Sequence, residues 1–170
     1  PLYSQRLLDQ SAAQLAALPA DAEVADRINL LSRLGDLQLI MGENRAATEN
    51  LQQALTLLRG LDKKVPATVK HHALKDVAIS FLRLGEIENC VTRCTCESCL
   101  LPIQAGGQHE QQEGSRRAME YLREALRAQP NDLSARWLLN VAAMTVGEYP
   151  DQLPTDQLIP PAAWQSDLSF

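Results

Sequence analysis

The four cysteines are the residues of this chain whose type and spacing could most readily do chemistry. Cys90, Cys94, Cys96 and Cys99 lie within one short stretch, and the other positions of the 170-residue sequence contain no cysteine. Cysteine thiolates form disulfides, bind metal ions or exchange disulfides with a partner. This cluster is therefore the most informative local feature of the sequence.

A disulfide role suits the segment in which the cysteines lie. Residues 90–114 contain a proline and a glycine pair and no helical periodicity, and such a segment is costly to order without a fastener. A Cys90–Cys99 bridge would close a short loop and contribute about 2–3 kcal/mol to stability. Four cysteines allow three pairings, of which Cys94–Cys96 is the least favourable because alternating side chains point apart.

A metal site is the second interpretation. Zinc takes four Cys or His ligands, and Cys96-x-x-Cys99 is a familiar ligand pair that Cys90, Cys94 and His109 could complete. Copper(I) or an iron–sulfur cluster would also accept thiolates. Thiol exchange through the same C-x-x-C pair is the third interpretation, although no thioredoxin-like strand–helix pattern surrounds it.

The rest of the sequence carries no catalytic motif. It has no phosphate-cradling glycine loop, no nucleophile elbow and no Ser–His–Asp set. The net charge of −5 with scattered basic residues argues against nucleic-acid binding. No apolar stretch approaches the roughly 20 residues of a membrane span. We expect a non-enzymatic protein, with no cofactor apart from a metal or cluster at the cysteines.

The composition predicts an all-α fold. Hydrophobic residues make up 45% and aromatic residues 4% of the chain, and the dominant alanine and leucine both favour helices. No alternating runs of β-branched residues indicate strands. The elements that position the cysteines are therefore expected to be helices.

An internal repeat is visible in the spacing of small and apolar residues. Seven positions match the tetratricopeptide pattern of two antiparallel helices: Leu31, Leu34, Gly35, Gly42, Ala47, Leu51 and Ala54. In this interpretation Gly35 and Ala47 allow the helices to approach closely, and Gly42 supplies a positive φ at the turn.

Two further repeats follow the first. The second begins near His71 and is interrupted by residues 90–114 before it resumes with a helix capped by Ser115. The third begins at Asp132, its predicted N-cap, and turns at Gly147. Residues 2–18 predict a helix that covers the first repeat. We expect a solenoid of about 2.5 repeats over residues 1–147, followed by an extended proline-rich tail over 148–170.

Both the repeat and the tail offer binding surfaces. The first helix of each tetratricopeptide repeat lines a concave groove, which suits an extended peptide or a helix, although packing against a terminal helix is the alternative. By register the groove carries Asn29, Ser32, Asp36, Leu39, Ile40, His72, Lys75, Ile79, Leu82, Arg83, Trp137, Val141 and Met144. The apolar tail residues Leu153, Leu158, Ile159, Trp164 and Phe170 are expected to dock on this domain or on a neighbour.

The second half of the chain resembles a more specific family. The residues that carry the resemblance are Asn89–Cys90, Glu97–Ser98–Cys99, Pro102–Ile103, His109, Gly114–Ser115–Arg116, Asp132–Leu133, Ala135–Arg136–Trp137–Leu138–Leu139–Asn140, Met144, Gly147, Tyr149–Pro150 and Leu158–Ile159–Pro160–Pro161. Together they resemble the tetratricopeptide region that precedes the FG-GAP β-propeller in ASPIC/UnbV-type proteins. Cys94 departs from that pattern, because it stands where the family has a histidine.

The resemblance implies an exported bacterial protein, periplasmic or extracellular, associated with a β-propeller. The main hypothesis is a non-catalytic docking module for another protein or complex subunit, with its insertion pinned by disulfides. The alternative is a metal-binding or redox domain that uses the cysteines and His109. The resemblance also suggests an accessory to an enzyme of natural-product assembly.

Overall fold

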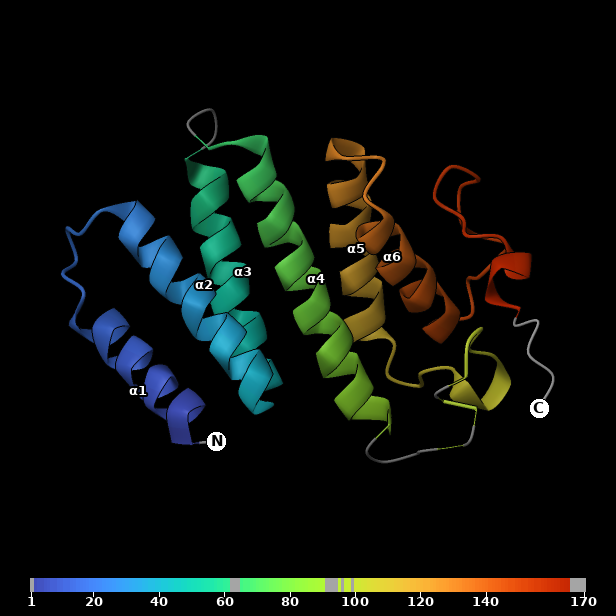
Figure 1. Ribbon diagram of the computed structural model, residues 1–170, viewed down its shortest axis with the longest axis horizontal. Helices are drawn as coiled ribbons and strands as arrows, with labels where there is room; N and C mark the ends of the chain where they lie inside the picture. The colour runs from blue at the N-terminus through green and yellow to red at the C-terminus, as the bar shows by residue number, and fades with distance from the viewer. Residues whose placement is uncertain (1, 62–64, 91–94, 96, 99, 166–170) are drawn as a thin grey trace. The chain divides into compact units, whose positions relative to one another are not determined.

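The computed structural model describes residues 2–61, 65–90, 95, 97–98 and 100–165. Over these residues the secondary structure is helical throughout, with no strand, which confirms the all-α prediction. The helices are α1 (Leu2–Ala17), α2 (Val24–Met41), α3 (Asn44–Gly60), α4 (Ala67–Cys90), α5 (Glu113–Ala128) and α6 (Leu133–Thr145), with short 3₁₀ helices η2 (Ala105–Gly107) and η3 (Pro161–Trp164) (Figure 1).

The chain forms two compact units. The first comprises Pro1–Leu84 and the second Gly85–Phe170. The observed division therefore differs from the predicted one between residues 147 and 148, because residues 148–165 belong to the second unit. Within the described ranges, none of the helices has both the length and the apolar content that crossing a membrane requires.

The first unit is organised around a hairpin of α2 and α3. Gly42 ends α2 with φ 81°, and the backbone N–H groups of Gly42 and Glu43 donate to the carbonyls of Leu39 and Gln38, as in the usual glycine-terminated helix. A Cβ atom on Gly35 would lie 2.6 Å from Cγ of Leu51. The predicted roles of Gly35 and Gly42 are thus confirmed.

The apolar periodicity of these helices produces one core. The buried side chains include Leu8 of α1, Leu31 and Leu34 of α2, Ala47, Leu51, Ala54, Leu55 and Leu58 of α3, and Leu74, Val77, Ala78 and Phe81 of α4. They recur three and four residues apart, so each helix buries one stripe and leaves the opposite stripe for solvent or a ligand. Arginine, aspartate and glutamine side chains occupy many of the remaining positions.

The second unit is built on the α5–α6 hairpin. The Asp132 carboxylate accepts a hydrogen bond of 2.9 Å from the backbone N–H of Ala135, which confirms Asp132 as the N-cap of α6. Gly147 follows α6 with φ 73° and forms the predicted turn. Ser115, the predicted cap of α5, lies inside that helix, which begins at Glu113, and its hydroxyl is used by another buried side chain.

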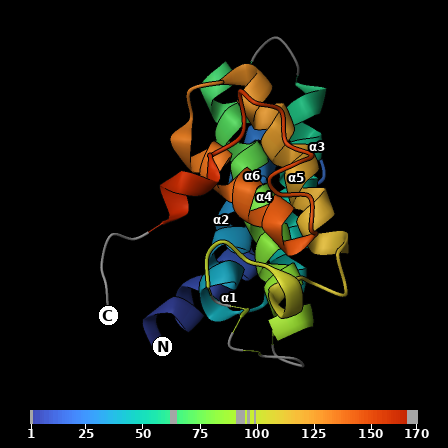
Figure 2. The ribbon, with the colours of Figure 1, turned by 90° about the vertical axis from the view of Figure 1, so that its right-hand side faces the viewer.

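The chain after α6 folds back onto that helix (Figure 1 and Figure 2). Asn140 is fully buried; its Nδ2 donates to the carbonyl of Gln157 at 2.8 Å, and its Oδ1 accepts from the N–H of Ile159 at 2.9 Å. The Tyr149 hydroxyl donates to the Ile159 carbonyl at 2.8 Å. The Asn140 side chain thus provides the tail backbone with a donor and an acceptor, as a neighbouring strand would in a sheet.

Apolar contacts complete the docking of the tail. Leu153 is buried, and Leu158 and Ile159 are half-buried. Trp164 packs edge-on against Tyr149 with ring centroids 6.4 Å apart. These tail residues are thus buried or half-buried within the second unit, whereas Phe170 lies outside the described residues.

Replacement of Asn140 by alanine should destabilise the second unit by about 2–3 kcal/mol, because it leaves buried backbone groups without partners. Tyr149→Phe, which removes only the hydroxyl, should cost about 1 kcal/mol. Both tryptophans of the chain, Trp137 and Trp164, lie in this unit, so urea unfolding followed by their fluorescence measures the effect. Asn131→Ala is the control, because Asn131 is exposed. An equal loss of stability in this control would contradict the role of Asn140 in holding the tail.

Candidate functional site

A hollow in the first unit collects residues from three helices. It has a volume of about 180 Å³, and residues of α2, α3 and α4 line it. Its lining consists of Ile28, Asn29, Ser32, Ala54, Leu58, Val69, His72, Ala73 and Asp76. Three of these, Asn29, Ser32 and His72, are residues that the sequence assigns to the groove.

Helical spacing explains why these side chains converge. On α2, Asn29, Ser32 and Asp36 are separated by three and four residues, and on α4, Val69, His72 and Asp76 have the same spacing. Residues three and four apart occupy the same face of a helix. On each helix these residues lie next to the buried apolar residues of the core. Packing of the core therefore brings the two sets of residues together.

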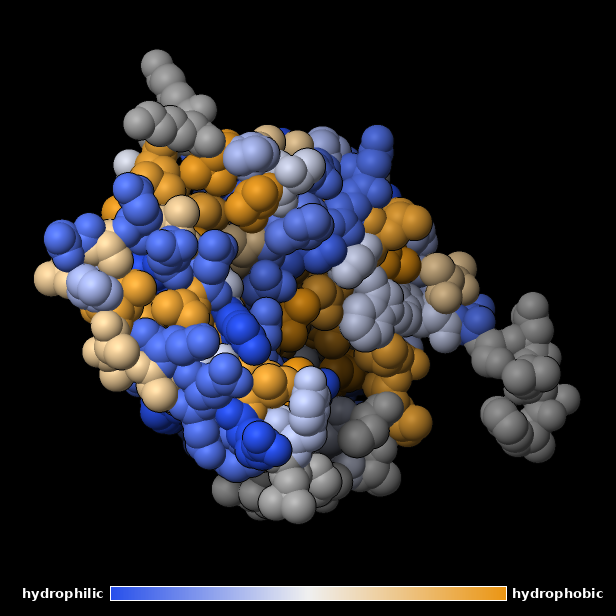
Figure 3. All heavy atoms as spheres, turned by 60° about the vertical axis from the view of Figure 1, so that its left-hand side comes forward, coloured by the Kyte–Doolittle hydropathy of each residue, from blue (hydrophilic) through white to orange (hydrophobic). Residues whose placement is uncertain are grey.

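The hollow has an apolar floor and a polar rim. Ile28, Ala54 and Leu58 are buried, whereas Asn29 and His72 are exposed. Val69 keeps 44% of its surface exposed at the edge. Figure 3 shows a face of the molecule on which hydrophilic and hydrophobic side chains are interspersed. Ligand sites commonly combine such an apolar surface with a few polar groups that fix orientation.

Two carboxylates give this region an unusual charge state. The pKa of Asp76 is raised to about 6, chiefly by burial and also by the nearby Asp36, while His72 and Lys75 act in the opposite direction to a smaller degree. Burial also raises the pKa of Asp36. The Asp76 carboxylate is thus held in a partly buried place beside the exposed Asp36, and carboxylates with a raised pKa are more common at functional sites than on plain surface.

Asp76 is the acidic residue of this site that the sequence analysis missed. It follows His72 by four residues and therefore extends the same stripe, which is a signal that the spacing alone contained. The other predicted residues of α4 are arranged around it: Lys75 and Ile79 are half-buried, Leu82 is buried and Arg83 is exposed. On α2, Leu39 is half-buried and Ile40 is 71% exposed.

The predicted groove residues of α6 are only partly accessible. Trp137 is 44% exposed and Val141 is half-buried. Met144 is 1% exposed, so its assignment to a groove is wrong. The last turn of α6 is enclosed because the N–H of His109 donates to the carbonyl of Thr145, and the N–H of Glu148 donates to that of Ala143.

A second, polar cavity of about 430 Å³ lies in the second unit. Its lining consists of Glu88, Asn89, Cys90, Thr95, Ser98, Ala105, Gly106, Gly107, Gln108, His109, Glu110 and Gln111. Cys90 and His109, two of the predicted disulfide or metal residues, thus share one cavity. Cys94, Cys96 and Cys99 lie outside the described residues, and among the described ones no three His, Cys, Asp or Glu side chains are grouped to hold a metal.

His109 anchors the insertion to the helices. Its Nδ1 lies 3.1 Å from the Ser115 hydroxyl, which in turn accepts from the Thr145 hydroxyl at 2.7 Å. Burial lowers the pKa of His109, and the nearby Glu86 raises it to a smaller degree. The imidazole is therefore neutral near pH 7, which is the form that can bind a metal.

Polar side chains also order the walls of this cavity. Nδ2 of Asn89 donates to the carbonyl of Gln111 at 3.0 Å, and its Oδ1 accepts from the N–H of the same residue at 2.9 Å. The Glu97 carboxylate accepts from the N–H of Gly106 at 2.8 Å. The sequence analysis assigned the ordering of this segment to cysteines and missed these contacts, because asparagine and glutamate in an irregular segment carry no distinctive spacing.

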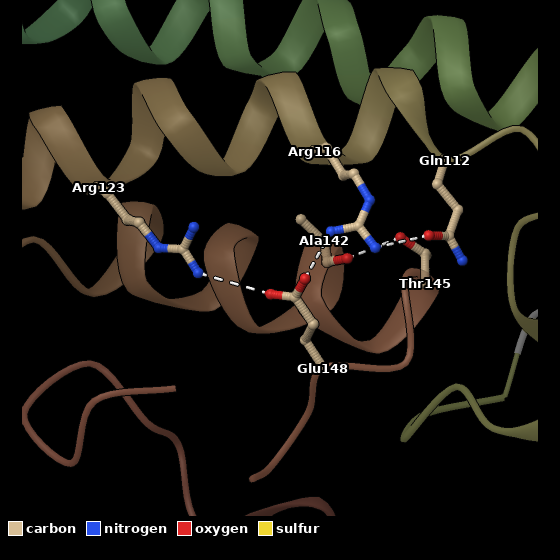
Figure 4. A network of polar contacts seen from close by, with 6 residues as sticks. All are labelled: Gln112, Arg116, Arg123, Ala142, Thr145 and Glu148. Atoms are coloured by element: carbon tan, nitrogen blue, oxygen red, sulfur yellow. Dashed lines mark hydrogen bonds and ion pairs between the residues drawn. The ribbon is translucent and has the colours of Figure 1, made fainter. Parts of the chain in front are cut away.

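An ion-pair network fixes the start of the tail (Figure 4). Glu148 pairs with Arg116 at 2.6 Å and with Arg123 at 3.7 Å, and its side chain is only 15% exposed. Arg116 also donates to the Gln112 side chain at 2.8 Å. Both arginines project from α5, so the network attaches the residue after the Gly147 turn to that helix.

Asp76→Asn should stabilise the first unit near neutral pH. The pKa of Asp76 is higher in the folded chain than the usual value of about 3.9, so the stability of the wild type falls as pH rises from about 4 to 6. The asparagine of the variant does not ionise, so its stability does not fall over this pH range. Allowing for the partial exposure of the carboxylate, we expect a gain of about 1 kcal/mol at about pH 7.5 and almost none at about pH 3.

Scanning calorimetry at the two pH values measures this difference. Asp151→Asn is the matched control, because Asp151 is exposed in a turn of the second unit. A gain that is the same at both pH values would contradict the assignment, since it would reflect a change in packing or helix propensity rather than the removal of a charge.

These geometries define two candidate sites, one in each unit. The chain was compared with protein-family models, with curated proteins and with solved structures. None of the three comparisons found a match. The function is therefore inferred from the residues of the two sites themselves.

Proposed function

We propose that this chain is a non-catalytic protein-interaction module of the tetratricopeptide type, which binds a partner protein at the hollow of its first unit. The observation that supports this best is the convergence of Asn29 and Ser32 from α2 with His72 from α4 on one hollow. These are residues for which the repeat pattern predicts a shared binding surface. The side chains combine apolar area with hydrogen-bonding groups, as peptide-binding grooves do.

The helical hairpins support the tetratricopeptide assignment. In the first repeat, α2 and α3 meet through Gly35 and Ala47 and turn at Gly42, as the pattern requires. In the second, α4 and α5 are the helices that precede and follow the cysteine-containing insertion along the chain. The third begins at α6 and is completed by the docked tail instead of a second helix.

The resemblance to ASPIC/UnbV-type proteins supports an exported setting beside a β-propeller. Several residues that carry the resemblance form contacts that fix the second unit: Asn89 binds the backbone of Gln111, His109 binds Ser115, and Asn140 binds the tail. In this proposal the second unit is the part that such a family would share, and the module works in the periplasm or outside the cell.

Selection of binding peptides tests the main proposal. Random phage-displayed peptides selected on the full chain should include binders that lose affinity by about tenfold or more on Ser32→Trp, which fills the hollow. Tryptophan at Ser134, an exposed position of α6, is the matched control and should leave the affinity unchanged. If no binder distinguishes the two variants, the hollow is not the binding site.

A metal-binding or redox domain is the second candidate function. It is favoured by one observation, the presence of Cys90 and the neutral His109 in the same polar cavity. The remaining cysteines, Cys94, Cys96 and Cys99, follow Cys90 closely in sequence. Such a set of thiolates and an imidazole suits zinc, copper(I) or an iron–sulfur cluster.

Intact-mass measurement separates the structural and metal roles of the cysteines. For two disulfides, the denatured protein should resist alkylation, and its mass should be lower by two hydrogen atoms for each bridge. For a metal site, all four thiols should be alkylated after denaturation, and the native protein should carry extra mass that a chelator removes. The first result would leave the cluster as a clasp and exclude the second candidate function.

A further inference from the structure

The hollow of the first unit has the size of one side chain rather than of a small-molecule ligand. Its volume is about 180 Å³, whereas sites for cofactors and drug-sized molecules measure roughly 300–1,000 Å³. Interfaces commonly concentrate their binding energy in a few anchor side chains that fill such pockets. The occupant is therefore expected to be a single anchor residue of a partner chain.

The lining determines which class of side chain fits. Ile28, Ala54 and Leu58 provide a buried apolar floor, which requires aliphatic or aromatic surface on the occupant. The Asp76 carboxylate lies at the same hollow, with Asp36 close enough to act on its charge. The occupant must therefore combine an apolar stem with a group that tolerates or pairs with two carboxylates.

We infer that the anchor is a lysine or arginine of an extended segment of the partner, an inference that rests on the function proposed above. Its methylene chain would lie on the apolar floor, and its cationic group would lie at Asp76 and Asp36. Lysine and arginine side chains bury their methylene stems against apolar surface while the charged group stays at a polar edge. A cation paired with a carboxylate also forms one of the stronger hydrogen bonds that proteins use.

The other classes of side chain fit poorly. A glutamate or aspartate would add a third negative charge beside Asp76 and Asp36. A purely apolar side chain would remove more water from the Asp76 carboxylate without providing a partner. The cationic groups already near Asp76 are His72 and Lys75 of its own helix, and their combined influence leaves its pKa raised. On α3, the residues at the hollow are the uncharged Ala54 and Leu58.

Polar groups at the rim would hold the rest of the segment. The Asn29 amide can donate to and accept from a backbone, and the Ser32 hydroxyl can do the same. Both project from α2 to the same hollow as His72 of α4. A segment that lies across the hollow would thus be bound through its backbone at α2 and selected through its anchor side chain, and this division of roles is common in peptide recognition.

The experiment uses the hollow-dependent peptides defined above, namely those that lose affinity on Ser32→Trp but not on Ser134→Trp. They should share a lysine or arginine. Replacement of that residue by norleucine, which keeps the stem and removes the charge, should weaken binding to the wild type about tenfold or more. On the Asp36→Asn, Asp76→Asn double variant, the two peptides should bind about equally.

The outcomes separate this inference from the function on which it depends. If the norleucine peptide binds the wild type as well as the parent peptide does, or if its loss persists unchanged on the double variant, the cationic anchor is wrong while the hollow remains the binding site. If no peptide depends on the hollow, both proposals fail. Calorimetry of each variant shows that the loss of affinity does not come from unfolding.

Discussion

The close contact between Gly35 of α2 and Leu51 of α3 is the constraint on which the first unit depends. Any side chain at position 35 would bring its Cβ atom within 2.6 Å of Leu51 Cγ, so glycine alone permits this separation of the helices. Successive residues of a helix point about 100° apart, and burial of Gly35 therefore turns Asp36 outward. The same contact that packs the core thus sets the direction from which Asp36 approaches Asp76 of α4.

The irregular segments of the second unit are fixed by polar side chains. Asn89 pairs with Gln111, Asn140 with Gln157 and Ile159, and His109 is linked to α5 through Ser115. In the first two pairs the backbone of an irregular segment obtains hydrogen bonds from a helix side chain, and in the third two side chains bind each other. The Asn140 contacts are partly buried, and because buried backbone groups without partners are costly, they determine the path of the tail.

Sequence reasoning succeeded where the signal was local. The helices, the turns at Gly42 and Gly147 and the N-cap at Asp132 depend on residues within one or two helical turns, so spacing alone revealed them. It failed where the outcome depended on distant residues. Ser115 resembles a cap, but His109 uses its hydroxyl. Met144 fits the register of a groove, but its side chain is buried. The shifted pKa of Asp76 arises partly from Asp36 on another helix.

The charge state of the hollow also accords with the binding role proposed for it. An aspartate whose ionisation opposes folding lowers the free energy of unfolding at neutral pH, and an amide of the same shape would avoid this loss. A bound group that favours the ionised carboxylate offsets part of this loss, because it lowers the carboxyl pKa in the complex. Carboxylates that destabilise the free protein therefore increase the preference of this hollow for a cation over a neutral side chain of equal size, in keeping with the trade-off between stability and function found at binding sites.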